Sequence, residues 1–244
     1  MKHKKIIFLV FLCIIIYLIY SFFHDDKISY IAIGDSLSAG VNSYGEKGYG
    51  YSDYVADYLR KNDKLRNYYN GFATPGYRIS DLKNQIVTNQ TLEYNNSFVS
   101  LKKSLRESSL VTVSIGGNDL LSNISLSTSS VETLDDDELI EIIDQMVIDL
   151  DDLLKEIRKY AKREVVLLGY YNTLHDSAHN IKRTFAYLDS KTNEVCKKYD
   201  VTYISLYSLF ENNEDFLPNP TNIHPNTAGY EAIANKIIKT LNNI

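Results

Sequence analysis

Short apolar runs rich in β-branched residues alternate along most of the chain with longer segments of helical periodicity. The apolar runs, each about as long as a strand, cover residues 28–33, 67–73, 110–115, 164–171 and 201–206. The spacing of apolar residues predicts helices at about 50–61, 136–161, 181–198 and 227–241. Strands that alternate with helices are typical of a parallel sheet covered on both faces. We therefore expect an α/β domain, a three-layer α/β/α sandwich with a parallel sheet.

A single domain accounts for residues 28–244. No internal repeat and no Pro- or Gly-rich linker divides this part of the sequence. The segment 123–133 is rich in Ser and Thr, and it is the part of the domain that we predict to be a mobile loop.

The chain begins with a different pattern. Residues 6–23 contain no charge and no helix breaker, and as a helix this run reaches roughly 27 Å, close to the thickness of the hydrocarbon core of a bilayer. Lysines within residues 1–5 orient the short side toward the cytoplasm. The pattern predicts a cytoplasmic tail at 1–5, a single transmembrane signal anchor at 6–23, and an extracellular domain at 28–244.

Two alternatives to an uncleaved anchor are less well supported. A cleaved signal peptide needs small residues at its exit, but Tyr20-Ser21-Phe22-Phe23 is bulky. Cys13 lies in the middle of the apolar run after bulky residues, so we interpret it as an apolar filler and not as a lipoprotein cysteine. The anchor therefore remains the favoured prediction.

Composition and charge narrow the classes of partner. The chain has 244 residues, a net charge of −5 and a mean hydropathy of −0.23, which are ordinary values for a soluble domain. Because three lysines lie within the first five residues, the domain is more acidic than the whole chain. Nucleic-acid binding needs a basic surface, so the balance argues against such a partner. Cys196 is the one cysteine of the domain, which therefore has no internal disulfide.

Four loops carry residues that are suited to chemistry, and all four follow strands or lead into a helix at one edge of the expected sheet. In an open parallel sheet, ligands bind outside the carboxyl ends of the strands. The segments are Gly34-Asp35-Ser36, Thr74-Pro75-Gly76, Gly116-Gly117-Asn118-Asp119 and Ile223-His224-Pro225-Asn226. Each segment taken alone is an ordinary cap or turn. Their joint occurrence indicates a site that combines a hydroxyl, flexible backbone, an amide donor and an imidazole.

These four segments resemble the four blocks of the SGNH, or GDSL, serine hydrolases, in type and in order. The resemblance covers nearly all of residues 28–244 and implies a flavodoxin-like sheet and hydrolysis of carboxylic esters. It implies that Ser36 is the nucleophile and His224 the general base. It also implies an oxyanion hole made by the N–H groups of Ser36 and Gly76 and the side-chain amide of Asn118. The anchored layout is similar to lipase/acylhydrolase-like members from low-GC Gram-positive bacteria.

The sequence departs from the family at one position. Family members usually carry an aspartate three residues before the histidine, but here that residue is Thr221, followed by Asn222. The nearest upstream carboxylate is Asp215. Three arrangements remain open: the Asn222 side-chain oxygen orients His224, a backbone carbonyl of this loop does so, or the loop folds back to deliver Asp215. Only the last supplies a full negative charge, so the first two predict slower chemistry.

No metal or cofactor is expected. His175 and His179 would share one side of a helix, but no HExxH pattern accompanies them. The acidic run 135–138 lacks the ligand spacing of a calcium loop.

The leading prediction is an extracellular, membrane-tethered serine esterase that acts on a small-molecule, lipid or glycan ester. One alternative is a deacetylase of cell-wall or surface glycans, which uses the same residues. Another is a degenerate hydrolase that serves as an envelope binding module, suggested by the missing aspartate. The pattern specifies no oligomeric state.

Overall fold

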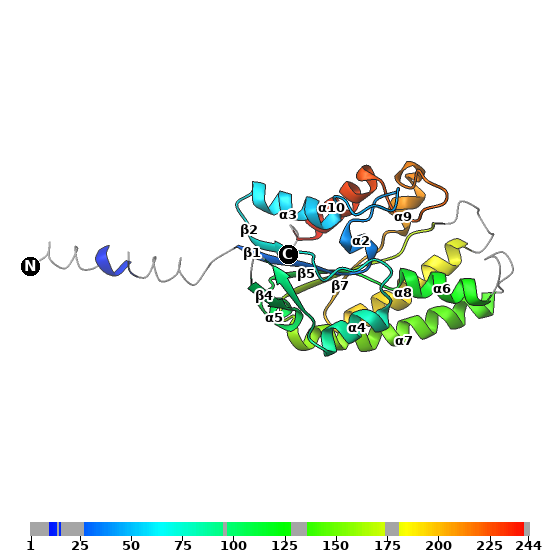
Figure 1. Ribbon diagram of the computed structural model, residues 1–244, viewed down its shortest axis with the longest axis horizontal. Helices are drawn as coiled ribbons and strands as arrows, with labels where there is room; N and C mark the ends of the chain where they lie inside the picture. The colour runs from blue at the N-terminus through cyan, green and yellow to red at the C-terminus, as the bar shows by residue number, and fades with distance from the viewer. Residues whose placement is uncertain are drawn as a thin grey trace, which may run out of the picture.

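A five-stranded parallel sheet forms the centre of the part of the chain that the computed structural model describes, residues 10–13, 15, 27–94, 97–127, 136–173 and 181–241 (Figure 1). In spatial order its strands are β2 (Leu65–Tyr69), β1 (Ile28–Gly34), β5 (Leu110–Ser114), β6 (Glu164–Leu168) and β7 (Thr202–Ile204). Every neighbouring pair is parallel. This order is the flavodoxin-like, doubly wound arrangement, so the predicted α/β class is confirmed.

Helices cover both faces of the sheet, as Figure 1 shows. One face carries α3 (Tyr51–Lys61) and α10 (Thr227–Leu241), and the other carries α4 (Ile79–Val87), α5 (Leu101–Glu107), α7 (Asp136–Tyr160) and α8 (Ile181–Lys198). Alternate side chains of a strand point to opposite faces. Accordingly Ile31 and Ile33 belong to the apolar cluster on the α7 side, while Tyr30 and Ala32 belong to the cluster on the α10 side. The sheet is the middle layer, and each apolar cluster joins it to the helices on one of its faces, which gives three layers.

The remaining elements lie at the ends of the strands or in the connections between them. They are α2 (Ser36–Ala39), α6 (Gly117–Ser127), α9 (Tyr207–Glu211), the 3₁₀ turn η2 (Glu214–Phe216) and an antiparallel hairpin of β3 (Thr91–Tyr94) and β4 (Ser97–Ser100). The predicted mobile loop 123–133 needs correction, because residues 123–127 continue α6. Residues 128–133 lie outside the described part.

Most of the predicted anchor at 6–23 also lies outside the described residues. Among the helices that are described, none has the length and apolar character needed to cross a membrane. The described domain begins at Lys27, one residue before β1. Because the strands are parallel, this beginning lies at the amino edge of the sheet, and the loops that follow the strands lie at the opposite edge.

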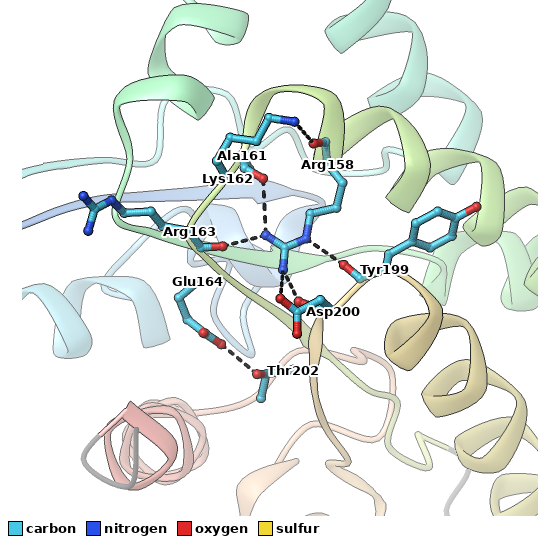
Figure 2. A network of polar contacts seen from close by, with 8 residues as sticks. All are labelled: Arg158, Ala161, Lys162, Arg163, Glu164, Tyr199, Asp200 and Thr202. Carbon is cyan, nitrogen blue, oxygen red and sulfur yellow. Dashed lines mark hydrogen bonds and ion pairs between the residues drawn. The ribbon is translucent and has the colours of Figure 1, made fainter.

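At the amino edge, the Arg158 guanidinium lies among main-chain carbonyl groups (Figure 2). Its Nε donates to the Tyr199 carbonyl at 2.8 Å, and its Nη1 donates to the carbonyls of Ala161 at 3.2 Å and Arg163 at 2.6 Å. Its Nη2 donates to the carbonyl of Asp200. One side chain therefore ties the end of α7 to the segment after α8 and to the start of β6.

Candidate active site

The close approach of β1 and β5 sets the position of Ser36. Gly34 ends β1 with φ of 120°, and a Cβ there would lie 1.9 Å from the Ser114 carbonyl oxygen. Asp35 caps α2 by accepting from the Leu37 N–H at 3.0 Å, and Ser114 Oγ donates to the same carboxyl oxygen at 2.8 Å. These contacts place Ser36 at the first turn of α2, beside the carboxyl end of β5.

His224 meets Ser36 from the other end of the chain. The two atoms Nε2 of His224 and Oγ of Ser36 are 2.7 Å apart. Tyr171, just after β6, donates its hydroxyl to the carbonyl of Ile223 at 2.9 Å, which holds the histidine loop against the sheet. The predicted nucleophile and base are thus within hydrogen-bond distance.

Asn222 determines which ring nitrogen of His224 carries the proton. Oδ1 of Asn222 lies 2.6 Å from Nδ1 of His224. The same oxygen accepts from the backbone N–H of His224 at 2.9 Å. A backbone N–H can only donate, so the Asn222 atom that faces it must be the oxygen. That oxygen can only accept, so Nδ1 carries the hydrogen and Nε2 has the free lone pair that faces the Ser36 hydroxyl.

The other candidates for this role lie elsewhere. Thr221 donates its hydroxyl to Oδ1 of Asn219 at 2.8 Å. Asp215 lies in η2, and its backbone carbonyl accepts from Asn226 at 2.7 Å. Among the described residues, the structure brings only the side chain of Asn222 to Nδ1 of His224. Neither a backbone carbonyl nor the Asp215 carboxylate takes that place.

Burial shifts the pKa of two groups at this edge. Desolvation lowers the pKa of His224 below its ordinary value, which keeps the imidazole neutral and able to accept a proton. Desolvation raises the pKa of Asp35 to about 7, although its hydrogen bonds from Ser114 and Leu37 act in the opposite direction. The carboxyl group that caps α2 beside Ser36 is therefore harder to ionise than an exposed aspartate.

The predicted oxyanion donors lie at the same edge. The N–H of Thr74 donates to the Gly34 carbonyl at 2.8 Å, which ties the glycine block to the end of β1. Gly76 has φ of 83°, a conformation that favours glycine. Asn118 Nδ2 uses one hydrogen to donate to the Tyr77 carbonyl at 2.8 Å, which leaves its second hydrogen for a ligand. In the described part of the chain, the N–H groups of Ser36 and Gly76 have no acceptor.

Sequence reasoning missed several residues that position this site. Ser114 holds Asp35, Tyr171 holds the histidine loop, and Asn219 donates to the Ser43 carbonyl at 2.9 Å and so links that loop to the segment after α2. Ser114 and Tyr171 stand at or just after the carboxyl ends of strands, and that position is the signal that would have found them. His175 and His179 lie outside the described residues. Within them, no group of three potential ligands forms a metal site.

Solved structures with the same fold include two esterases. A lipase, Lip_vut3 from a goat rumen metagenome, has a TM-score of 0.68 at 20% identity, over 86% of this chain and 95% of that one. Axe2, an acetylxylan esterase from Geobacillus stearothermophilus, has a TM-score of 0.59 at 18% identity, over 86% and 92%. Among the catalytic mutants of Axe2 are replacements of a serine, of a histidine and of an aspartate three positions before that histidine. The same offset from His224 falls on Thr221 here.

A family comparison covers most of the chain. No curated protein matches it significantly. The model of the GDSL-like lipase/acylhydrolase family matches residues 32–232, a range that includes all four blocks. Together with the parallel sheet and its order of strands, this match shows that the chain belongs to the GDSL-like lipase/acylhydrolase family, whose members hydrolyse esters.

Proposed function

We propose that this enzyme cleaves carboxylic esters through a Ser36–His224–Asn222 triad. The observation that carries the proposal is the continuous chain of contacts from Oγ of Ser36 through both ring nitrogens of His224 to Oδ1 of Asn222. Oγ attacks the ester carbonyl while Nε2 takes its proton, and the alcohol leaves with that proton as the acyl-enzyme forms. Water then attacks the acyl group, with His224 again as base, which releases the acid and restores Ser36.

The tetrahedral oxyanion is stabilised by the N–H groups of Ser36 and Gly76 and by the second hydrogen of the Asn118 amide. One such donor contributes roughly 3 to 4 kcal/mol to transition-state stabilisation in enzymes where it has been removed. The bond from Asn118 to the Tyr77 carbonyl fixes the amide beside the glycine block before substrate arrives. The donors are therefore positioned in advance.

Asn222 fixes the tautomer of His224 without a negative charge. The imidazolium that forms during attack therefore has a dipole beside it and no carboxylate, and we expect slower turnover than an aspartate would support. Orientation of the ring is nonetheless complete, which favours catalysis over a degenerate binding module. The missing aspartate alone does not imply an inactive site.

The location that we propose is the outer face of the cell membrane, with residues 6–23 as anchor. This rests on the apolar run and on the lysines before it. The seven residues of β1 span about 23 Å at roughly 3.3 Å per residue, so Ser36 would lie at the edge away from the tether. Digestion of intact cells with an added protease tests this location, because only an outward domain is accessible to it.

A glycan deacetylase is the second candidate for the activity. It uses the same triad and oxyanion donors and differs only in the alcohol that leaves. The structural neighbour Axe2 is an acetylxylan esterase. The dependence of the hydrolysis rate on substrate length separates the two candidates. A glycan deacetylase responds to the length of the alcohol part, whereas a lipase responds to the length of the acyl chain.

Hydrolysis of p-nitrophenyl acetate by the full chain in detergent tests the mechanism. We expect turnover and labelling by a fluorophosphonate probe, both lost in Ser36→Ala. Ser38→Ala is a matched control in the same helix, since the Ser38 hydroxyl donates to the Ile33 carbonyl at 2.8 Å, away from His224. Activity that survives in Ser36→Ala, or a folded wild-type enzyme that neither turns over nor labels, contradicts the proposal.

A further inference from the structure

An open groove with a volume of about 550 Å³ runs along α4, from Tyr77 beside the glycine block to Thr91 at the start of β3. This volume lies within the range of ordinary ligand sites. The groove, called here the α4 groove, has no assigned role in the triad or among the oxyanion donors. It begins one residue after Gly76.

The lining of the α4 groove is polar and nearly uncharged. Asp81, Asn84 and the C-cap Thr88 follow one another at spacings of three and four, which places them along one side of α4, and Tyr77 precedes the helix. Gln85, Asn89, Gln90 and Thr91 complete the lining. Asp81 is the one charged member of this set. Amide and hydroxyl groups of this kind bind a neutral ligand rich in hydroxyls, whereas an acyl chain needs apolar walls.

One lining residue has an unused acceptor. The Gln85 side chain is 4% exposed, and its Nε2 donates to the Phe72 carbonyl at 3.1 Å. Since a carbonyl can only accept, the other atom of this amide is the oxygen, and Oε1 has no partner in the described part of the chain. A buried acceptor without a partner costs about 1 to 3 kcal/mol. A ligand hydroxyl that reaches Oε1 through a small rotation of the amide would remove that cost.

The α4 groove is also connected to the oxyanion donors. The Tyr77 backbone carbonyl accepts from the Asn118 amide at 2.8 Å, and Tyr77 is also one of the residues that line the groove. A ligand that occupies the groove therefore lies against the residue that positions one donor. Tyr77 is thus the lining residue next to the glycine block, and a substrate with its ester at Ser36 would enter the groove past it.

We propose that the α4 groove binds the sugar chain of an O-acylated neutral oligosaccharide. The sugar hydroxyls pair with the amide and hydroxyl side chains of α4 and with Gln85, and the acyl carbonyl faces Ser36. This inference rests on the proposed ester hydrolysis and adds the class of alcohol: a polyhydroxylated chain and not a glycerolipid.

Kinetics with substrates of graded length test the α4 groove. The probes are O-acetylated oligosaccharides of xylose and of N-acetylglucosamine, from monosaccharide to tetrasaccharide, with the full chain in detergent. We expect kcat/KM to rise about tenfold with length in at least one series, as two added hydrogen bonds would give. The variant Asn84→Ala/Thr88→Ala should lose this rise, through KM, while its kcat/KM for p-nitrophenyl acetate is unchanged.

Ser80→Ala is the matched control, because Ser80 is an exposed residue of α4 outside the lining. It should keep the full dependence on length, and thermal unfolding should show all variants folded. Absence of the rise in both wild-type series, or its persistence in the double variant, overturns the α4 groove as a sugar site. Hydrolysis of p-nitrophenyl acetate that depends on Ser36 would then still uphold the esterase. Loss of that hydrolysis is the separate failure of the proposed function.

Discussion

The two edges of the sheet use polar groups in opposite ways. At the amino edge, the Arg158 guanidinium donates to four main-chain carbonyls, so its hydrogen-bonding capacity is consumed within the protein (Figure 2). At the carboxyl edge, the N–H groups of Ser36 and Gly76 have no acceptor among the described residues, and His224 offers a lone pair to a hydroxyl. Donors that are bonded to main-chain carbonyls hold elements together, whereas donors without an acceptor in the described part of the chain are available to a ligand. Substitutions at the two edges should therefore separate stability from activity.

The largest effect is expected for His224→Ala. Loss of the base should lower kcat for p-nitrophenyl acetate by about 10⁴-fold to 10⁶-fold, the range found when one member of a serine triad is removed. The midpoint of thermal unfolding should change little, because His224 is only half-buried. Asp215→Asn is the matched control: its carboxylate has no contact with His224, so activity should stay at the wild-type value. A large loss in Asp215→Asn would show that the loop rearranges in solution.

Two substitutions at Asn222 come next. Asn222→Ala removes the oxygen that fixes the tautomer, and kcat should fall by roughly 10²-fold to 10⁴-fold, as for a triad whose histidine has lost its orienting group. Asn222→Asp keeps the acceptor and adds a charge that stabilises the imidazolium, so kcat should rise by about tenfold.

The pH profile of kcat/KM gives a second measurement on the same pair. In the wild type, burial lowers the pKa of His224, so the acid limb of activity lies below the pKa of an exposed histidine. A carboxylate at position 222 favours the protonated ring, so its pKa rises and the acid limb moves to higher pH. An unchanged limb in Asn222→Asp would contradict the proposed contact between the two side chains.

This pair also shows where sequence reasoning stops. The blocks around Ser36, Gly76, Asn118 and His224 are local in sequence, so their residues could be named without a structure. From the sequence alone, the partner of Nδ1 stays open among three arrangements, of which Asn222 is one, because the choice depends on a turn in which the Asn222 side chain accepts from the N–H two residues later. That turn brings the residue two positions before His224 to the ring, in place of the one three positions before it.

The fold likewise has elements that the sequence predicts and elements that it does not. Helices α8 and α10 begin and end where the apolar spacing predicts, at 181–198 and 227–241, because that spacing is uninterrupted. The apolar run at 67–73 is misleading: β2 ends at Tyr69, and Ala73 forms only an isolated bridge with Gly34. The chain turns at Gly71 and Phe72, a change of direction that the apolar pattern does not indicate. Two of the contacts of Arg158, with Tyr199 and Asp200, reach across more than 40 residues, so no local pattern predicts them.

At the amino edge, Arg158→Met should lower the free energy of unfolding and spare activity. The loss should be about 2 to 4 kcal/mol, since the four hydrogen bonds to main-chain carbonyls, two of them part-buried and two exposed, are each worth roughly 0.5 to 1.5 kcal/mol. Urea unfolding measures it. Arg60→Met is the matched control, because its ion pair with Asp57 is exposed and should contribute less than about 1 kcal/mol. A fall in kcat without a loss of stability in Arg158→Met would remove the distinction between the edges.

The smallest effect is expected for Tyr170→Phe, beside Tyr171 at the carboxyl edge. The buried Tyr170 hydroxyl has no hydrogen-bond partner in the described part of the chain and lies against Gly116. Removing it should leave stability unchanged or raise it by up to about 1 kcal/mol, because no bond is lost. Tyr171→Phe removes the hydrogen bond to the Ile223 carbonyl, so it should cost about 1 kcal/mol and lower kcat as the histidine loop loosens. Equal losses in both variants would mean that the Tyr170 hydroxyl also has a hydrogen-bond partner, which would contradict its place among the unsatisfied groups of the carboxyl edge.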